Sequence, residues 1–232
     1  MNKIIALMMA AALMLCAVAS AEAATLTVRG TGVVSLDPDT VVITLGVRES
    51  APDVSDVQVA VNTKLNSVIE KFRELGIGDD DIHTNSIFLT QNYDYSRSDE
   101  QLIGYIAENT VAVTTRDIEN VGKYIDEAFE AGANYFSDIS FSASETEGAM
   151  NQALRLSVEN AREKAEVLAE AAGMKLDGVI SISEEPYSYG YENAKFAIAE
   201  SDADTGSGTP VMSSKIQVSA SVTVEYTLSP VE

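Results

Sequence analysis

The sequence predicts an α+β fold in which three helices cover a single, mostly antiparallel sheet. The segment from Ile216 to Leu228 alternates between apolar and mostly polar residues, the pattern of a strand with one buried face. Three other segments carry apolar residues every three or four positions, as amphipathic helices do. From Thr40 to Phe141 the predicted elements follow the order β-α-β-β-α-β, a ferredoxin-like core to which a further helix and strands are added.

The first residues have the features of a secretory signal peptide. Lys3 precedes an almost wholly apolar run, and small residues allow cleavage after Ala21 or Ala23. The apolar run is shorter than the roughly 20 residues that a transmembrane helix needs. We therefore expect residues 1–23 to be removed, and residues 24–232 to form a periplasmic or otherwise exported domain without a transmembrane segment.

Cysteine content and charge exclude several classes of protein. The only cysteine, Cys16, lies in the predicted signal peptide, so the mature chain has no disulfide, thiol nucleophile or cysteine-bound metal. The net charge is −21, and it stays −21 without residues 1–23 because Lys3 and Glu22 cancel. Such a surface repels nucleic acids and anionic membranes, although it identifies no partner.

The predicted domain opens with a β-hairpin. Its first strand runs from Leu26 to Leu36, Asp37-Pro38-Asp39 makes the turn, and Val41 to Val47 mark the second strand. The Gly30-Thr31-Gly32 segment lacks the third glycine and the following helix of a dinucleotide-binding loop. Glycines at positions where backbones approach closely, or where a strand bulges, explain this segment better.

The three helices have recognisable beginnings, apolar faces and ends. The first follows Ser50-Ala51-Pro52-Asp53 and ends at Gly76, with apolar residues at Val54, Val57, Val61, Leu65, Val68, Phe72 and Leu75. For the second, Asp117 is the predicted N-cap and Gly132 follows the last turn, and the predicted buried residues are Ile118, Val121, Ile125 and Phe129. Ser144 and Glu147 predict a capping box for the third, whose apolar residues are Met150, Leu154, Val158, Ala161, Ala165, Leu168 and Ala172.

The remaining segments are strands and one long irregular stretch. Strands are expected at residues 82–95, 102–115, 135–141 and 179–183. Residues 184–214 have no regular pattern, and loops of this length are usually functional or mobile.

Few residues suggest a chemical site. His83 is the only histidine, so a catalytic triad or a histidine-based zinc site is not expected. Asp79, Asp80 and Asp81, with His83, are weak metal-ligand candidates that a polar turn explains equally well. No acid–base pair is recognisable among the carboxylates, and no catalytic residue or cofactor is predicted.

Tyrosines supply the predicted contact residues. Tyr93, Tyr95 and Tyr105 fall near the hairpin of the middle strands, and Tyr187, Tyr189 and Tyr191 open the irregular stretch. They are candidates for an oligomer or interaction surface. Cross-strand packing is the alternative explanation for the first three.

Several blocks in fixed order resemble the SIMPL-domain family, in its bacterial periplasmic immunogenic (outer-membrane-fraction) branch. They are Val28-Arg29-Gly30-Thr31-Gly32, Leu45-Gly46-Val47, Asp81-Ile82-His83-Thr84, Ala131-Gly132-Ala133-Asn134, Ala161-Arg162-Glu163-Lys164-Ala165 and Val218-Ser219-Ala220-Ser221-Val222. The resemblance implies an envelope protein without an established enzymatic activity or accepted catalytic residues. It also implies a link to oxidative-stress tolerance and, for some members, ring-like or channel-like homo-oligomers.

The sequence therefore predicts a non-catalytic envelope protein that associates with itself through exposed strand edges. Peripheral association with the outer membrane is compatible with this prediction. The alternative is a periplasmic module that binds a small ligand or a metal in a cleft beside the tyrosines.

Overall fold

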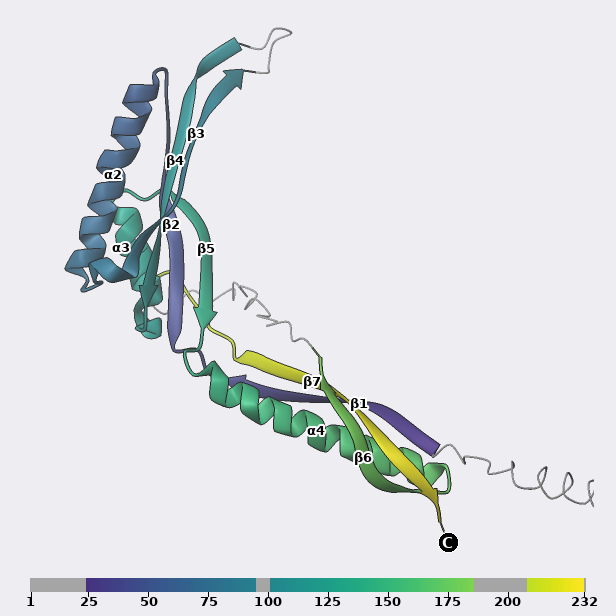
Figure 1. Cartoon of the computed structure of the whole chain (residues 1–232). Coiled ribbons are helices and arrows are strands. Elements are labelled where there is room, and N and C mark those ends of the chain that lie inside the picture. The colour runs from purple at the N-terminus through teal and green to yellow at the C-terminus, as the bar shows by residue number, and fades with distance from the viewer. Residues whose placement is uncertain (1–23, 95–100, 186–207, 232) are drawn as a thin grey trace, which may run out of the picture. The chain divides into compact units, whose positions relative to one another are not determined.

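The computed structural model describes residues 24–94, 101–185 and 208–231 (Figure 1). The predicted signal peptide, and most of the irregular stretch at 184–214, lie outside the described residues. The described residues form two compact units. One comprises residues 24–32, 153–185 and 220–231, and the other comprises the described parts of 33–152 and 188–219.

The larger unit has a four-stranded antiparallel sheet in the order β3-β4-β2-β5. Its elements are β2 (Thr40–Ala51), α2 (Val54–Glu74), the 3₁₀ helix η1 (Asp79–Asp81), β3 (Ile82–Asp94), β4 (Gln101–Thr115), the 3₁₀ helix η2 (Ile118–Asn120), α3 (Val121–Glu130) and β5 (Tyr135–Ser142). This strand order and the β-α-β-β-α-β connectivity confirm the predicted ferredoxin-like arrangement.

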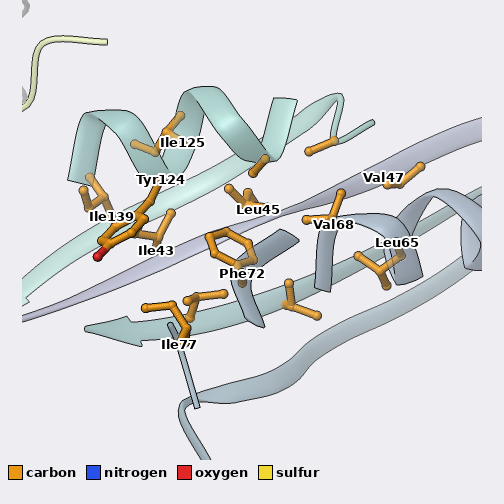
Figure 2. Close-up of a cluster of buried hydrophobic side chains, with 14 of the residues drawn as sticks. Ile43, Leu45, Val47, Leu65, Val68, Phe72, Ile77, Tyr124, Ile125 and Ile139 are labelled. Carbon is orange, nitrogen blue, oxygen red and sulfur yellow. The ribbon is translucent and has the colours of Figure 1, made fainter. Parts of the chain in front are cut away.

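The core of this unit lies between the sheet and its two helices. Side chains from α2, α3 and β2 converge around Phe72, as Figure 2 shows. The fully buried residues include Ile43, Leu45, Val61 and Val68, which are the inward-facing positions of their strand and helix. The helix pattern predicted for residues 54–75 is therefore confirmed.

Helix α2 ends in a Schellman motif built on Gly76. Gly76 has φ +90°, its N–H donates to the carbonyl oxygen of Arg73, and the N–H of Ile77 donates to that of Phe72. Ile77 is then buried in the core, in the hydrophobic contact that accompanies this motif. The predicted end of the helix is correct.

Helix α3 begins differently from the prediction. The 3₁₀ helix η2 precedes it, and Asp117 makes no side-chain cap to the backbone. The Asp117 carboxylate instead accepts hydrogen bonds from Asn120 Nδ2 and the Tyr124 hydroxyl, each at 2.9 Å. Phe129 is also exposed rather than buried, because the buried face runs through Tyr124, Ile125 and Ala128.

The smaller unit is built on a three-stranded sheet in the order β1-β7-β6. Its elements are β1 (Ala24–Leu36), α4 (Thr146–Ala171), β6 (Met174–Glu184) and β7 (Ile216–Pro230). In β7 every second residue from Val218 to Tyr226 is buried, as the alternation predicts.

Two predictions about pairing are wrong. Strands β1 and β2 belong to different sheets, so they form no hairpin, and the strands divide between two sheets instead of one. The α+β class itself, with three helices and antiparallel sheets, is confirmed. The alternation of apolar and polar residues identifies the buried face of a strand but not the strand beside it, which explains why the predicted pairing differs from the observed one.

Helix α4 packs very closely on β1, and two glycines make this possible. A Cβ added to Gly30 would lie 1.9 Å from the carbonyl oxygen of Ser157, and one added to Gly32 would lie 2.1 Å from that of Ala153. The interpretation of these glycines as sites of close backbone approach is thus confirmed. The fully buried helix residues are small ones, spaced by four: Ala153, Ser157, Ala161 and Ala165.

The predicted apolar face of α4 is therefore wrong in part. Val158, Leu168 and Ala172 are exposed, because a helix this close to a strand has room only for small side chains. The predicted capping box is also absent. The backbone N–H of Ser144 donates to the carboxylate of Asp39 at 3.0 Å, and the Ser144 hydroxyl donates to the same carboxylate.

Candidate functional site

The predicted metal-ligand candidates lie at the surface, where α2 connects to β3. Asp79, Asp80 and Asp81 form η1, and the exposed His83 lies opposite Ala112 in the sheet. Arg73 Nε donates to Asp79 Oδ1 at 2.7 Å, so an arginine already neutralises this carboxylate. Among the described residues there is no group of three or more histidine, cysteine, aspartate or glutamate side chains arranged to hold a metal ion.

The structure describes two of the six tyrosines predicted as contact residues. Tyr105 is half-buried and packs against the core of the larger unit, opposite Gln91. The Tyr93 hydroxyl donates to Gln91 Oε1 at 2.7 Å. Tyr95, Tyr187, Tyr189 and Tyr191 lie outside the described residues.

The ionisable groups with shifted pKa values support local structure. Hydrogen bonds from Ser144 and Thr40 lower the pKa of Asp39. Hydrogen bonds from Asn120 and Tyr124 lower the pKa of Asp117, while burial raises that of Tyr124. These contacts hold the turn before β2 and the start of α3, and they place no acid and base across a cleft.

The most distinctive surface of the larger unit is apolar. We call it the apolar hairpin surface, and it consists of Ile87, Phe88, Leu89, Leu102 and Ile103, which are exposed by between 41% and 73%. Ile87, Phe88 and Leu89 follow one another on β3, and Leu102 and Ile103 lie on β4 farther along the same hairpin, where Leu102 is opposite Tyr93. Large apolar side chains at such exposure commonly mark a binding surface when they gather on one element.

The position of β3 in the sheet explains this exposure. Strand β3 is at the edge of the sheet, which leaves Ile87, Phe88 and Leu89 without a neighbouring strand on one side. Strand β2 ends at Ala51 opposite Tyr105, so the β3–β4 hairpin, with Leu102 and Ile103, continues past the rest of the sheet (Figure 1). Residues 84–93 contain no charged side chain, in a chain with a net charge of −21. Charged residues usually protect edge strands from pairing with another chain, and this strand lacks that protection.

The sequence carries a signal for this surface that our predictions did not use. Ile87, Phe88 and Leu89 are consecutive, so they interrupt the alternation of a half-buried strand. Successive side chains of a strand point to opposite faces, so three consecutive apolar residues are either buried on both faces of the sheet or exposed on one of its faces.

Strand β1, an edge strand of the smaller unit, has a protection that β3 lacks. The N–H of Thr31 donates to Asn160 Oδ1 at 3.1 Å, and Lys164 Nζ donates to the carbonyl oxygen of Arg29 at 3.0 Å. Both partners come from α4. Side chains of the helix therefore occupy backbone groups of β1 that another strand would otherwise bond.

No helix in the described part of the chain is both long enough and apolar enough to cross a membrane.

Comparison with known proteins provides the family. The chain is 30% identical over 168 residues to the 26 kDa periplasmic immunogenic protein of Brucella melitensis, an alignment covering 70% of this chain and 67% of that protein. It is 28% identical over 154 residues to the uncharacterized protein YggE of Edwardsiella ictaluri, covering 66% of this chain and 64% of the relative. The Escherichia coli K12 YggE is also 28% identical, with 62% of its length covered.

The sequence profile of the SIMPL family, described as a protein of unknown function (DUF541), matches residues 26–226. This match spans both units. The chain therefore belongs to the SIMPL family.

Proposed function

We propose that this chain is a non-catalytic protein of the cell envelope that assembles into homo-oligomers through the apolar hairpin surface. The observation that carries the proposal is the exposed edge strand β3, whose residues 84–93 carry no charge. Export to the periplasm is supported by the features of residues 1–23 and by the periplasmic name of the Brucella relative.

The charge of the chain favours β3 as the point of self-contact. Two copies that each carry a net charge of −21 repel one another over most of their surfaces. An interface between them is least costly where charge is absent, and residues 84–93 are such a segment. Pairing of this edge with another copy would satisfy backbone groups and also remove Ile87 and Phe88 from water.

The exposed residues themselves provide the test. Ile87→Lys places a charge on β3 at a side chain that is 73% exposed, so the fold of a single copy has little reason to change. Val59→Lys is the matched control, because Val59 is 66% exposed on α2 of the same unit. Sedimentation at micromolar concentration should show an oligomer for the wild type and for Val59→Lys, and smaller species for Ile87→Lys. A monomeric wild type, or an Ile87→Lys oligomer of unchanged size, would contradict the proposal.

Cellular assays complete the test. We propose a role in tolerance of oxidative or envelope stress, as the family resemblance implies. Cells lacking the protein should recover peroxide resistance with the wild type and with Val59→Lys, but not with Ile87→Lys. Fractionation of the envelope separates free periplasmic protein from protein that associates peripherally with the outer membrane.

A further inference from the structure

The smaller unit contains a cavity that the self-association proposal does not use. Its volume is about 620 Å³, within the range of small-molecule sites, and it lies between α4 and β6 with Tyr226 of β7 in its lining. Val158 of α4 and Met174, Leu176 and Val179 of β6 provide apolar walls.

The close packing of α4 on β1 explains why apolar residues of α4 and β6 are exposed. Because small residues bring α4 onto β1, the helix leaves Val179 more than half exposed on the third strand. Val179 lies opposite Tyr226 in the sheet, so both residues face the side that α4 covers. The cavity occupies the remaining space beside the helix.

Tyr226 is a largely buried residue whose hydroxyl makes no hydrogen bond to another described residue. The residue is only 4% exposed. The comparably buried Tyr124, by contrast, donates to Asp117. No side-chain oxygen or nitrogen of the described residues is both buried and unpaired, so the Tyr226 hydroxyl is accessible from the cavity that it lines and is free to bond a ligand or water there.

The charges around the cavity indicate the sign of the ligand. Arg162 Nε donates to Glu166 Oε1 at 2.9 Å, so these two lining residues neutralise each other. The Asp177 carboxylate accepts a hydrogen bond from Ser229, whose position in the register faces away from α4. Lys175 also lines the cavity, but it lies opposite Ser229 and therefore faces the same side of the sheet, away from α4. Glu170 remains, an exposed lining carboxylate with no cation partner among the described residues.

The hydroxyl of Tyr226 is protonated at neutral pH. Burial raises its pKa, while the neighbouring Arg162 lowers it and Glu166 raises it. A protonated hydroxyl can accept a hydrogen bond from an ammonium group and can also donate one.

We propose that this cavity binds a small organic amine with an apolar body. The ammonium group pairs with Glu170 and donates to the Tyr226 hydroxyl, and the apolar body lies against Met174, Leu176 and Val179. The net charge of −21 raises the local concentration of such a cation. None of these residues belongs to the apolar hairpin surface, so the proposal stands or falls independently of self-association.

Three probes of equal chain length separate the contributions of charge and apolar surface. Octylamine, octanol and octanoate are titrated into the purified full-length mature protein, with the ¹³C-methyl signal of Met174 as the readout, assigned with Met174→Leu. Octylamine should shift this signal saturably and bind at least about tenfold more tightly than octanoate, the change that 1.4 kcal/mol produces. Equal binding of the three probes, or an unchanged Met174 signal, would overturn the proposal.

Three variants test the named contacts. Tyr226→Phe removes only the hydroxyl and should weaken octylamine binding by roughly two- to tenfold. Glu170→Gln should weaken it by a similar factor, whereas Glu163→Gln, on the same helix but outside this cavity, should not. Weakening by Glu163→Gln equal to that by Glu170→Gln would show only a general charge effect and would overturn the assigned site. Unchanged melting temperatures verify that each variant is folded.

Discussion

Replacing Gly30 by alanine tests the close packing of α4 on β1. The added Cβ would lie 1.9 Å from the carbonyl oxygen of Ser157 and 2.6 Å from the amide nitrogen of Ala161. Both atoms belong to the helix backbone, so no change of rotamer relieves the overlap. Ordinary contact begins near 3.4 Å, and the strand and helix must therefore separate.

The expected loss follows from this separation. Overpacking in a core costs roughly 1–3 kcal/mol, and the contacts of Ala161 and Ala165, both fully buried, weaken as well. Alanine is favoured over glycine in a strand by roughly 0.5–1 kcal/mol, which offsets part of the cost. We expect a net loss of about 2 kcal/mol in the free energy of unfolding, or about 4–8 °C in melting temperature.

Urea and thermal unfolding followed by circular dichroism measure this loss. Gly148→Ala is the control, because no atom lies within 4 Å of its added Cβ and it is on the same helix. It should raise stability by roughly 0.5–1 kcal/mol. The double variant Gly30→Ala/Ala161→Gly should stay destabilised, since the Ser157 carbonyl remains in place. Wild-type stability of Gly30→Ala would refute the packing argument.

Two further predictions concern carboxylates that hold local structure. Hydrogen bonds from Ser144 lower the pKa of Asp39 in the folded protein. The ionised carboxylate therefore stabilises the folded state fully above the unfolded pKa of about 3.9. This stabilisation disappears as the pH falls through the lower pKa of the folded state. The difference in urea midpoint between wild type and Asp39→Asn should therefore be full at pH 6 and shrink below about pH 4; a difference that does not change with pH would contradict this. Asp126 accepts hydrogen bonds from the N–H and the hydroxyl of Thr209, which anchor the segment before β7 to α3. Asp126→Ala should accelerate amide hydrogen exchange at Thr209 by roughly two- to tenfold, whereas Asp126→Asn, which keeps an acceptor, should change it less. Unchanged exchange in Asp126→Ala would show that the anchor is unimportant.

The elements that could be predicted from the sequence are those defined by local patterns. The apolar stripe of α2 and the glycine after it determine a helix and its end within neighbouring residues, and both are correct. The alternation from Val218 to Tyr226 likewise depends only on the geometry of one strand. The partner of β1 depends on residues far along the chain, and no local pattern contains that information.

Helix α4 shows how tertiary packing selects among possible faces. Its predicted apolar face combines Ala161 and Ala165, which are buried, with larger residues such as Leu168, which are exposed. The glycines of β1 require the stripe that includes Ser157 and Ala161. Glycine on the strand and small residues on the helix had to be considered together to find this face.

The candidate surfaces were only partly predictable for the same reason. The sequence predicts self-association through exposed strand edges, but it indicates the tyrosines, and not Ile87 and Phe88, as contact residues. Exposure of these two residues depends on the place of β3 at the edge of the sheet, which is a property of the whole sheet. The cavity beside Tyr226 arises from helix placement, and alternation alone marks Tyr226 as an ordinary core residue.

The pairing of β1 with β7 has a consequence for the order of folding. The first strand of the sheet cannot find its neighbour until the last strand has been synthesised, so the smaller unit forms late. Residues 40–142 contain all the strands of the larger sheet and can fold beforehand. During that interval Val28 lacks its native neighbours on β7, Val222 and Val224, and only α4 is available to cover the glycine-rich strand around it.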